Sequence, residues 1–169
     1  MRRARRDDCP AILAIYNDAV LTTTASYDYE PRTLEHRQDW FDAHQREDYA
    51  IFVAEEVSPD GSKRILGWSA LNKFHDRMGY RFTAENSVYV AAEARGRGLG
   101  SALLGPLVEA AQARGLHAIL AVIDAQNEAS LRLHAKFGFE QVGLFKQVGF
   151  KFGRWLDVAY LEKLLPDVD

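Results

Sequence analysis

The stretch from residue 87 to 123 limits the possible folds most strongly. Residues 87–91 have the composition of a strand and lead into a glycine-rich bend. Apolar residues then recur at helical spacing as far as Gly115, and a short, almost wholly apolar run follows at 118–123. This order predicts a strand, a long helix and a buried strand. Strands joined in this way pair in parallel through a right-handed crossover, so the sheet must contain a parallel pair.

The remaining segments add strands and helices on both sides of this unit. Before it we expect a short strand at 1–6 and a helix at 8–20 that Asp8 caps. A loop at 22–31 and a helix from Thr33 to about Glu47 follow. Two strands, at 49–57 and 65–74, are then joined by a turn at 58–61. After it we expect a helix at 128–137 and strands at about 140–150 and 155–164. The sequence predicts an α/β fold with a mixed, mostly antiparallel sheet of about six to seven strands and about four helices.

Composition narrows the class of protein. The 169 residues, 47% hydrophobic, suit one domain spanning 1–169. A net charge of -3 gives no general attraction to nucleic acid or to anionic membranes, so neither is an expected partner. The single cysteine, Cys9, excludes an intrachain disulfide and is expected to be a buried, inert thiol. With no apolar run of about 18 residues and no signal peptide, we expect a cytoplasmic protein.

The glycine-rich bend has the chemistry of a diphosphate site. It reads Arg95-Gly96-Arg97-Gly98-Leu99-Gly100-Ser101 and opens the long helix. Glycines let a phosphate approach the backbone, and the N–H groups at a helix start favour an anion. The alternative is a flexible turn whose arginines serve solubility. The bend lacks the lysine of a P-loop, and its glycine spacing differs from the dinucleotide fingerprint.

The positions of Arg95, Gly98 and Gly100 resemble the Arg/Gln-x-x-Gly-x-Gly/Ala signature of the GCN5-related N-acetyltransferases (GNAT). The resemblance extends over nearly the whole chain. The sequence is similar to the phosphinothricin and methionine sulfoximine acetyltransferase branch at residues 15–17, 23–26, 85–90, 127–130, 133–134, 138–139 and 149–157. It implies the GNAT fold, acetyl-CoA as co-substrate, and acetylation of the free amine of a small amino-acid-like molecule. The branch is commonly dimeric, which implies a homodimer.

The resemblance also implies how the co-substrate is held. In this family two neighbouring parallel strands splay apart, and the pantetheine arm lies in the gap like an added strand. The cofactor-binding residues carried over are Val88, Tyr89, Val90, Arg95, Gly96, Arg97, Gly98, Gly100, Ser101, Asn127 and Ser130. Asn127 can also cap the following helix, and Ser130 is either a cofactor contact or an exposed serine of the first turn.

Two residues match catalytic positions of the branch. Glu85 matches the general base, which must deprotonate the ammonium before it attacks; from the sequence alone it can equally be an exposed glutamate at a strand end. His134 stands where many family members have a tyrosine acid. An imidazole titrates near neutral pH and can protonate the leaving thiolate, but His134 can equally be structural.

The acceptor side is carried over from the same branch. Tyr27, Arg77 and Tyr80 are candidate substrate-binding residues, the arginine for an acidic group and the tyrosines as walls; the alternative is a surface arginine and packing tyrosines. The other histidines show no paired metal-ligand spacing, so we expect no metal. Two further hypotheses stay open: an acetyltransferase for a protein N-terminus or a polyamine, and a non-catalytic acetyl-CoA sensor.

Overall fold

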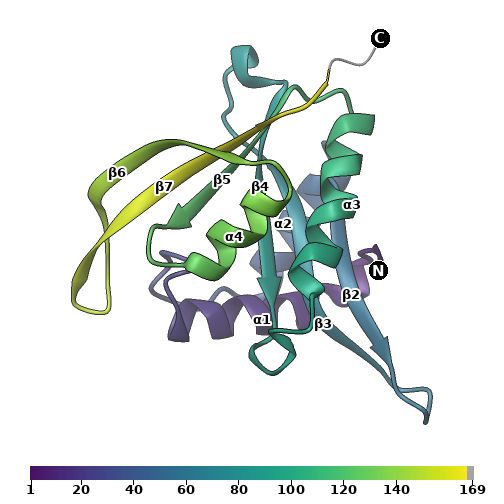
Figure 1. The fold of residues 1–169 in the computed structure, drawn as a ribbon. Helices are drawn as coiled ribbons and strands as arrows, with labels where there is room; N and C mark the ends of the chain where they lie inside the picture. The colour runs from purple at the N-terminus through teal and green to yellow at the C-terminus, as the bar shows by residue number, and fades with distance from the viewer. Residues whose placement is uncertain (167–169) are drawn as a thin grey trace.

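A computed structural model describes residues 1–166 and contains one seven-stranded sheet in the order β1-β2-β3-β4-β5-β7-β6 (Figure 1). The strands are β1 (Arg2–Arg3), β2 (Ile51–Val57), β3 (Lys63–Lys73), β4 (Thr83–Val90), β5 (Ala118–Asp124), β6 (Glu140–Lys151) and β7 (Arg154–Leu164). Neighbouring strands are antiparallel except β4 and β5, which pair in parallel across the α3 crossover. The predicted fold class and the predicted parallel pair are confirmed.

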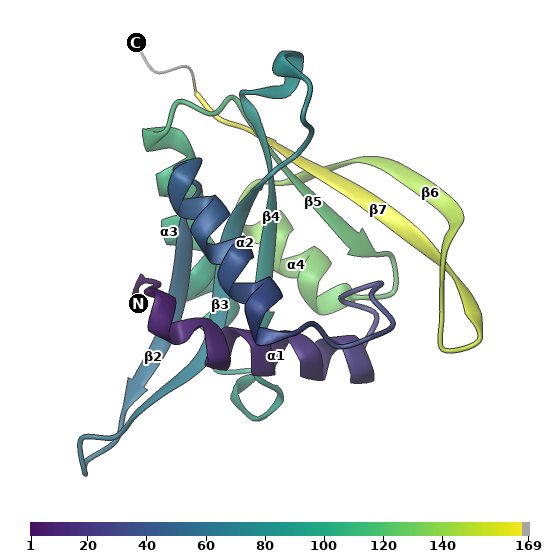
Figure 2. The ribbon, with the colours of Figure 1, turned by 180° about the vertical axis from the view of Figure 1, so that it is seen from behind.

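Helices cover both faces of the sheet. Helices α1 (Cys9–Thr22) and α2 (Leu34–Arg46) lie on one face, and α3 (Leu99–Ala113) and α4 (Glu128–Lys136) lie on the other, as Figures 1 and 2 show. Three single 3-10 turns complete the order: η1 (Arg6–Asp8), η2 (Met78–Tyr80) and η3 (Ala92–Ala94). Among residues 1–166, no helix has the length and apolar character needed to cross a bilayer.

Each face of the sheet has its own apolar core. Leu71, Leu104, Leu107 and Ile119 belong to the cluster under α3 and α4, and Cys9, Ile12, Val53 and Trp68 belong to the cluster under α1 and α2. Alternate residues of a strand point to opposite faces, so β3 supplies Leu71 to one core and Trp68 to the other. The two cores hold the sheet rigid between the helical layers.

Some predicted element ends need correction. Strand β4 begins at Thr83 rather than at residue 87, because Thr83 to Glu85 pair with β5, and Ala84 and Glu85 also pair with β3. Strand β1 has two residues, since only Arg2 and Arg3 pair with β2. The Asp8 side chain does not cap α1; it accepts the Arg5 N–H at 2.7 Å and pairs with Arg2. The Thr33 cap is confirmed by its bond from the His36 N–H.

Strands β6 and β7 form a long hairpin that projects from the sheet and returns against the loop between α1 and α2 (Figure 2). The buried Lys151 Nζ donates to the carbonyl oxygens of Thr23 and Ser26 at 2.9 and 2.5 Å. A Cβ on Gly149 would lie 2.6 Å from the Tyr27 ring, so only glycine permits this close packing. The hairpin therefore fixes the α1–α2 loop.

Replacing Leu107 by Ala should lower the free energy of unfolding by about 2–5 kcal/mol, because it leaves a cavity in the core under α3. Leu107 is fully buried, whereas Leu21 on α1 is 57% exposed. Leu21→Ala is the matched control and should change the free energy by less than about 0.5 kcal/mol. Urea unfolding followed by circular dichroism measures both, and equal losses would contradict the assigned core.

Candidate functional site

The two parallel strands separate within the sheet. Their ladder joins Thr83 to Ala118 and ends where Glu85 pairs with Leu120, although both strands continue. The Asn86 Nδ2 donates to the Leu120 carbonyl at 3.2 Å, so a side chain bridges the strands where backbone pairing stops. Beyond this point the strands diverge (Figure 1) and line a cleft of about 1010 Å³. The cleft is wide enough for an extended chain to lie between them.

The glycine-rich bend lies at one end of this cleft. Gly96 and Gly98 have φ angles of 76° and 78°, which favour glycine, and Gly98 is the N-cap of α3. A Cβ at either position would meet nothing within 4 Å, so the space beside them is open. The first N–H groups of a helix have no partner inside it. Open space, free donors and a helix start together fit a diphosphate, as predicted for this bend.

The two arginines of the bend point to different places. Arg95 lines the cleft, and its Nε donates to the Val90 carbonyl at 3.4 Å. Arg97 instead pairs with Glu56 at 2.6 Å and is not among the residues that line the cleft. The structure therefore brings Arg95, but not Arg97, to the site.

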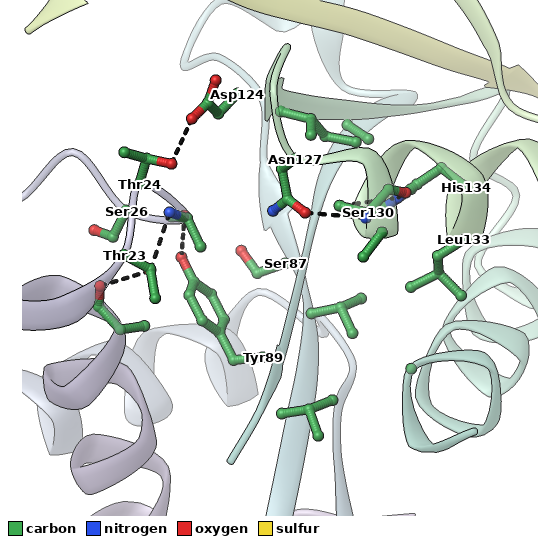
Figure 3. A pocket seen from close by; sticks show the side chains of 18 of the residues that line it. Thr23, Thr24, Ser26, Ser87, Tyr89, Asp124, Asn127, Ser130, Leu133 and His134 are labelled. Atoms are coloured by element: carbon green, nitrogen blue, oxygen red, sulfur yellow. Dashed lines mark hydrogen bonds between the residues drawn. The ribbon is translucent and has the colours of Figure 1, made fainter. Parts of the chain in front are cut away.

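Helix α4 begins at the opposite wall of the cleft. Asn127 Oδ1 accepts the Ser130 N–H at 3.1 Å, so the predicted cap is confirmed. Asn127 and Ser130 also line the cleft, beside Ser87 and Tyr89 of β4 (Figure 3). Val88 and Val90 line it as well, which brings ten of the eleven predicted cofactor-binding residues to one cavity.

His134 connects α4 to the point where the strands separate. Its side chain is buried, with Nδ1 2.8 Å from the Ser130 carbonyl oxygen and Nε2 3.0 Å from Asn86 Oδ1. A neutral imidazole can donate through one nitrogen only, whereas a charged ring can donate to both acceptors. Burial lowers the pKa of His134, and the bond to Ser130 opposes this. The ring lines the cleft but is held on two sides.

Glu85 lies at the last rung of the parallel ladder. It shares a face of β4 with Ser87 and Tyr89, toward α1, while Ala84 and Val88 pack under α3. Burial raises the pKa of the Glu85 carboxyl above its ordinary value. Glu85 lines the cleft, so a carboxylate with raised proton affinity faces the cavity.

The α1–α2 loop closes the cleft on this side. The Tyr89 hydroxyl donates to the Ala25 carbonyl at 3.0 Å, and the Thr24 hydroxyl donates to the Asp124 carboxylate (Figure 3). Tyr27 lines the cleft, as predicted. Arg77 and Tyr80 lie in the exposed segment between β3 and β4, where Tyr80 packs on Phe74, and neither lines the cleft.

The sequence analysis did not single out Asn86, Asp124 or Lys151. Asn86 carried one available signal, since it is a polar residue on the strand face otherwise occupied by Ala84 and Val88. Asp124 and Lys151 act through contacts with the α1–α2 loop, which sequence spacing does not reveal. In the part of the chain described, no three His, Cys, Asp or Glu side chains are grouped to hold a metal ion.

Comparison with known proteins agrees with this geometry. The model of the Acetyltransferase (GNAT) family matches residues 12–139. An L-methionine sulfoximine/L-methionine sulfone acetyltransferase of Pseudomonas paraeruginosa is 46% identical, over 96% of this chain and 92% of the relative.

Two solved structures extend the comparison. A phosphinothricin acetyltransferase from Sinorhizobium meliloti in complex with acetyl-CoA is 36% identical with a TM-score of 0.91, over 97% of this chain and 86% of that one. A ribosomal-protein-alanine N-acetyltransferase from Brucella melitensis is 43% identical with a TM-score of 0.91, over 97% and 98% of the two chains. The chain therefore belongs to the GNAT family of acetyltransferases and uses acetyl-CoA as its co-substrate.

Proposed function

We propose that this acetyltransferase acylates the free amine of small amino-acid-like molecules such as methionine sulfoximine, methionine sulfone or phosphinothricin, with Glu85 as general base. The observation that carries the proposal is the position of Glu85, half-buried in the cleft at the point where β4 and β5 separate. The names of the Pseudomonas and Sinorhizobium relatives support this acceptor class.

The chain's own residues account for the proton transfers. Bound acetyl-CoA supplies an activated acetyl group. Glu85 takes a proton from the acceptor ammonium, so that the nitrogen can form its bond to the acetyl carbon while the carbon–sulfur bond breaks. The thiolate then takes a proton, from His134 or from water. The residues of the glycine-rich bend that line the cleft, Arg95, Gly96 and Gly98 to Ser101, hold the diphosphate, and Val88, Tyr89 and Val90 lie along the arm.

A second acceptor class has a specific observation in its favour. The Brucella relative is named a ribosomal-protein-alanine N-acetyltransferase, and it is 43% identical to this chain. Thiol release should be measured with glufosinate, methionine sulfoximine, methionine sulfone, common amino acids and an alanine-initiated peptide. Turnover of the peptide alone would overturn the small-molecule acceptor and leave the acetyltransferase assignment intact.

Gly98→Ala should raise the acetyl-CoA dissociation constant at least about tenfold, because the new methyl group enters the open space of the cradle. Gly61→Ala is the matched control, since Gly61 also has a positive φ, 82°, and open surroundings, in the β2–β3 turn. Both variants should lose about 1 kcal/mol of stability from the left-handed backbone. Calorimetric titration with acetyl-CoA separates them; equal affinities would contradict the cradle.

Glu85→Gln should lower kcat about 10²–10⁴-fold and leave the acetyl-CoA dissociation constant unchanged, because the amide cannot accept the ammonium proton. Glu140→Gln, on the exposed start of β6, is the control. Since burial raises the pKa of Glu85, native kcat/KM should rise with pH through that raised pKa, and the variant should lack this rise. Unchanged activity would contradict the role of Glu85 as general base.

The same substitution has a stability signature. Because burial raises the pKa of Glu85, the folded protein holds this proton more tightly than the unfolded chain, so its contribution to stability falls as pH rises above the unfolded value. Glu85→Gln removes that loss. The melting temperature of the variant minus that of the native protein should be larger at pH 8 than at pH 4. Equal values at the two pH values would contradict a carboxyl whose pKa is raised by burial.

We also propose that the protein is a homodimer joined through the β6–β7 hairpin. This hairpin exposes large apolar side chains: Val142, Leu144, Phe145, Val148, Phe150, Phe152, Trp155 and Leu164. Large exposed apolar side chains gathered on one hairpin are typical of an interaction surface. Its position beside the α1–α2 loop links the contact to the acceptor side of the cleft.

Val148→Glu should shift the protein from a dimer to a 19.1 kDa monomer, because it places a charge in this apolar surface. Val57→Glu is the matched control, since Val57 is 59% exposed and Val148 is 58% exposed. Size-exclusion chromatography with light scattering measures both masses. A native monomer, or a dimer that survives Val148→Glu, would contradict the proposed contact.

A further inference from the structure

A second cavity of about 220 Å³ lies between α1, α2 and the sheet. Its lining includes Tyr16 of α1, Arg37 and Trp40 of α2, and Trp68 of β3. Ser87 and Tyr89 line both this cavity and the main cleft, so the two spaces meet at these residues. The cavity therefore adjoins the part of the cleft where Glu85 lies.

Arg37, the buried cation of this cavity, has no counter-ion among residues 1–166. Arg37 is 4% exposed, and its guanidinium carbon lies 4.7, 4.5 and 5.3 Å from the ring centres of Tyr16, Trp40 and Trp68. Its Nε has no hydrogen-bond partner, and no carboxylate within residues 1–166 comes within 4.0 Å of the guanidinium. The Trp68 Nε1 is also buried without a partner.

The other charged groups that line the cavity leave this charge uncompensated. Asp28 pairs with Arg32 at 2.7 Å and accepts the Tyr16 hydroxyl at 2.7 Å, so its carboxylate is already engaged. His36, which also lines the cavity, cannot supply a negative charge. A buried charge without a partner is unfavourable, and an incoming anion would remove that penalty. The aromatic rings stabilise the cation but offer no hydrogen-bond acceptor in the ring plane of the guanidinium.

The cavity lies within reach of an acceptor bound at Glu85. Glu85 and Ser87 are two residues apart on one face of β4, a distance of about 7 Å. Ser87 Oγ accepts a hydrogen bond from Asn72 Nδ2 at 3.0 Å, which turns this side chain toward β3. The Tyr89 ring stacks on Trp68 with centroids 4.8 Å apart. One small molecule can therefore place an amine near Glu85 and an acidic group beyond Ser87.

We propose that the Arg37 cavity binds the acidic group of the acceptor. This inference rests on the proposed function and identifies the acceptor as an amine that carries a carboxylate or a similar anion. The planar guanidinium can donate two parallel hydrogen bonds to such a group, and Trp68 Nε1 can donate a third. Arg77, the candidate that the resemblance offered for this task, lies outside both cavities.

Arg37→Met tests the proposal, because methionine fills the aromatic cage without a charge. With methionine sulfone as acceptor, its KM should rise at least about tenfold while the KM for acetyl-CoA stays constant. With the matched carboxamide of methionine sulfone, native protein and variant should have similar KM values. Arg46→Met, on the exposed end of α2, is the control and should change none of these values. A variant that still prefers the acid to the amide by the native factor would overturn the proposal.

A binding measurement separates this inference from the proposed function. The cavity contains two of the three tryptophans, so fluorescence can report binding of 4-(methylsulfonyl)butanoate, an analogue that has the acid but no amine. We expect saturable binding to the native protein that Arg37→Met weakens at least about tenfold. In the assay, this analogue should compete with the acceptor.

Each combination of outcomes is informative. Saturable binding that depends on Arg37, without turnover of any amine, would support the anion site and overturn the proposed activity. Binding without competition against the acceptor would show a free-anion site and overturn the acceptor assignment. If Arg37→Met fails to fold, Arg37→Lys keeps the charge but loses the planar fork, and it should raise the same KM; an unchanged KM would overturn the proposal.

Discussion

The separation of β4 from β5 is the constraint on which the site depends. Two parallel strands that remain paired leave no room between them, but here backbone pairing ends at Glu85 and Leu120. The Asn86 side chain bonds the Leu120 carbonyl, and His134 holds Asn86 from α4. A short polar chain thus fixes the place where the opening begins. Because α3 and α4 both start beside the gap, their N-termini face whatever lies in it.

The raised pKa of Glu85 depends on structure far from it in sequence. Its cause is burial, and the α1–α2 loop lines the same cleft as Glu85. That loop is held by Tyr89 at Ala25, by Asp124 at Thr24 and by Lys151 at two carbonyls. Lys151 belongs to the hairpin with the exposed apolar surface. A dimer formed there would therefore also stabilise the α1–α2 loop, which lines the cleft that contains Glu85.

Local patterns predicted the features that short-range physics decides. The crossover unit, the glycine bend with positive φ angles and the caps at Thr33 and Asn127 each depend on a few neighbouring residues. The resemblance predicted residues that line the cleft, as at Glu85 and Ser130. Sequence could not predict that Arg97 pairs with Glu56, since these residues meet only through the β2–β3–β4 sheet. The Arg37 cavity was equally hidden, because α2, β3 and β4 each supply part of it.

Local charge, rather than net charge, explains how an acidic protein can bind anions. The chain carries a net charge of -3, yet the cleft presents glycine N–H groups and Arg95 at one end. On the proposed assignment, the Arg37 cavity presents a second positive site beyond Ser87. Glu85, the proposed base, lies between the two, and burial raises its pKa, so its carboxylate is a stronger proton acceptor than that of an exposed glutamate. An exposed glutamate at this place would keep its ordinary pKa and would take the ammonium proton less readily.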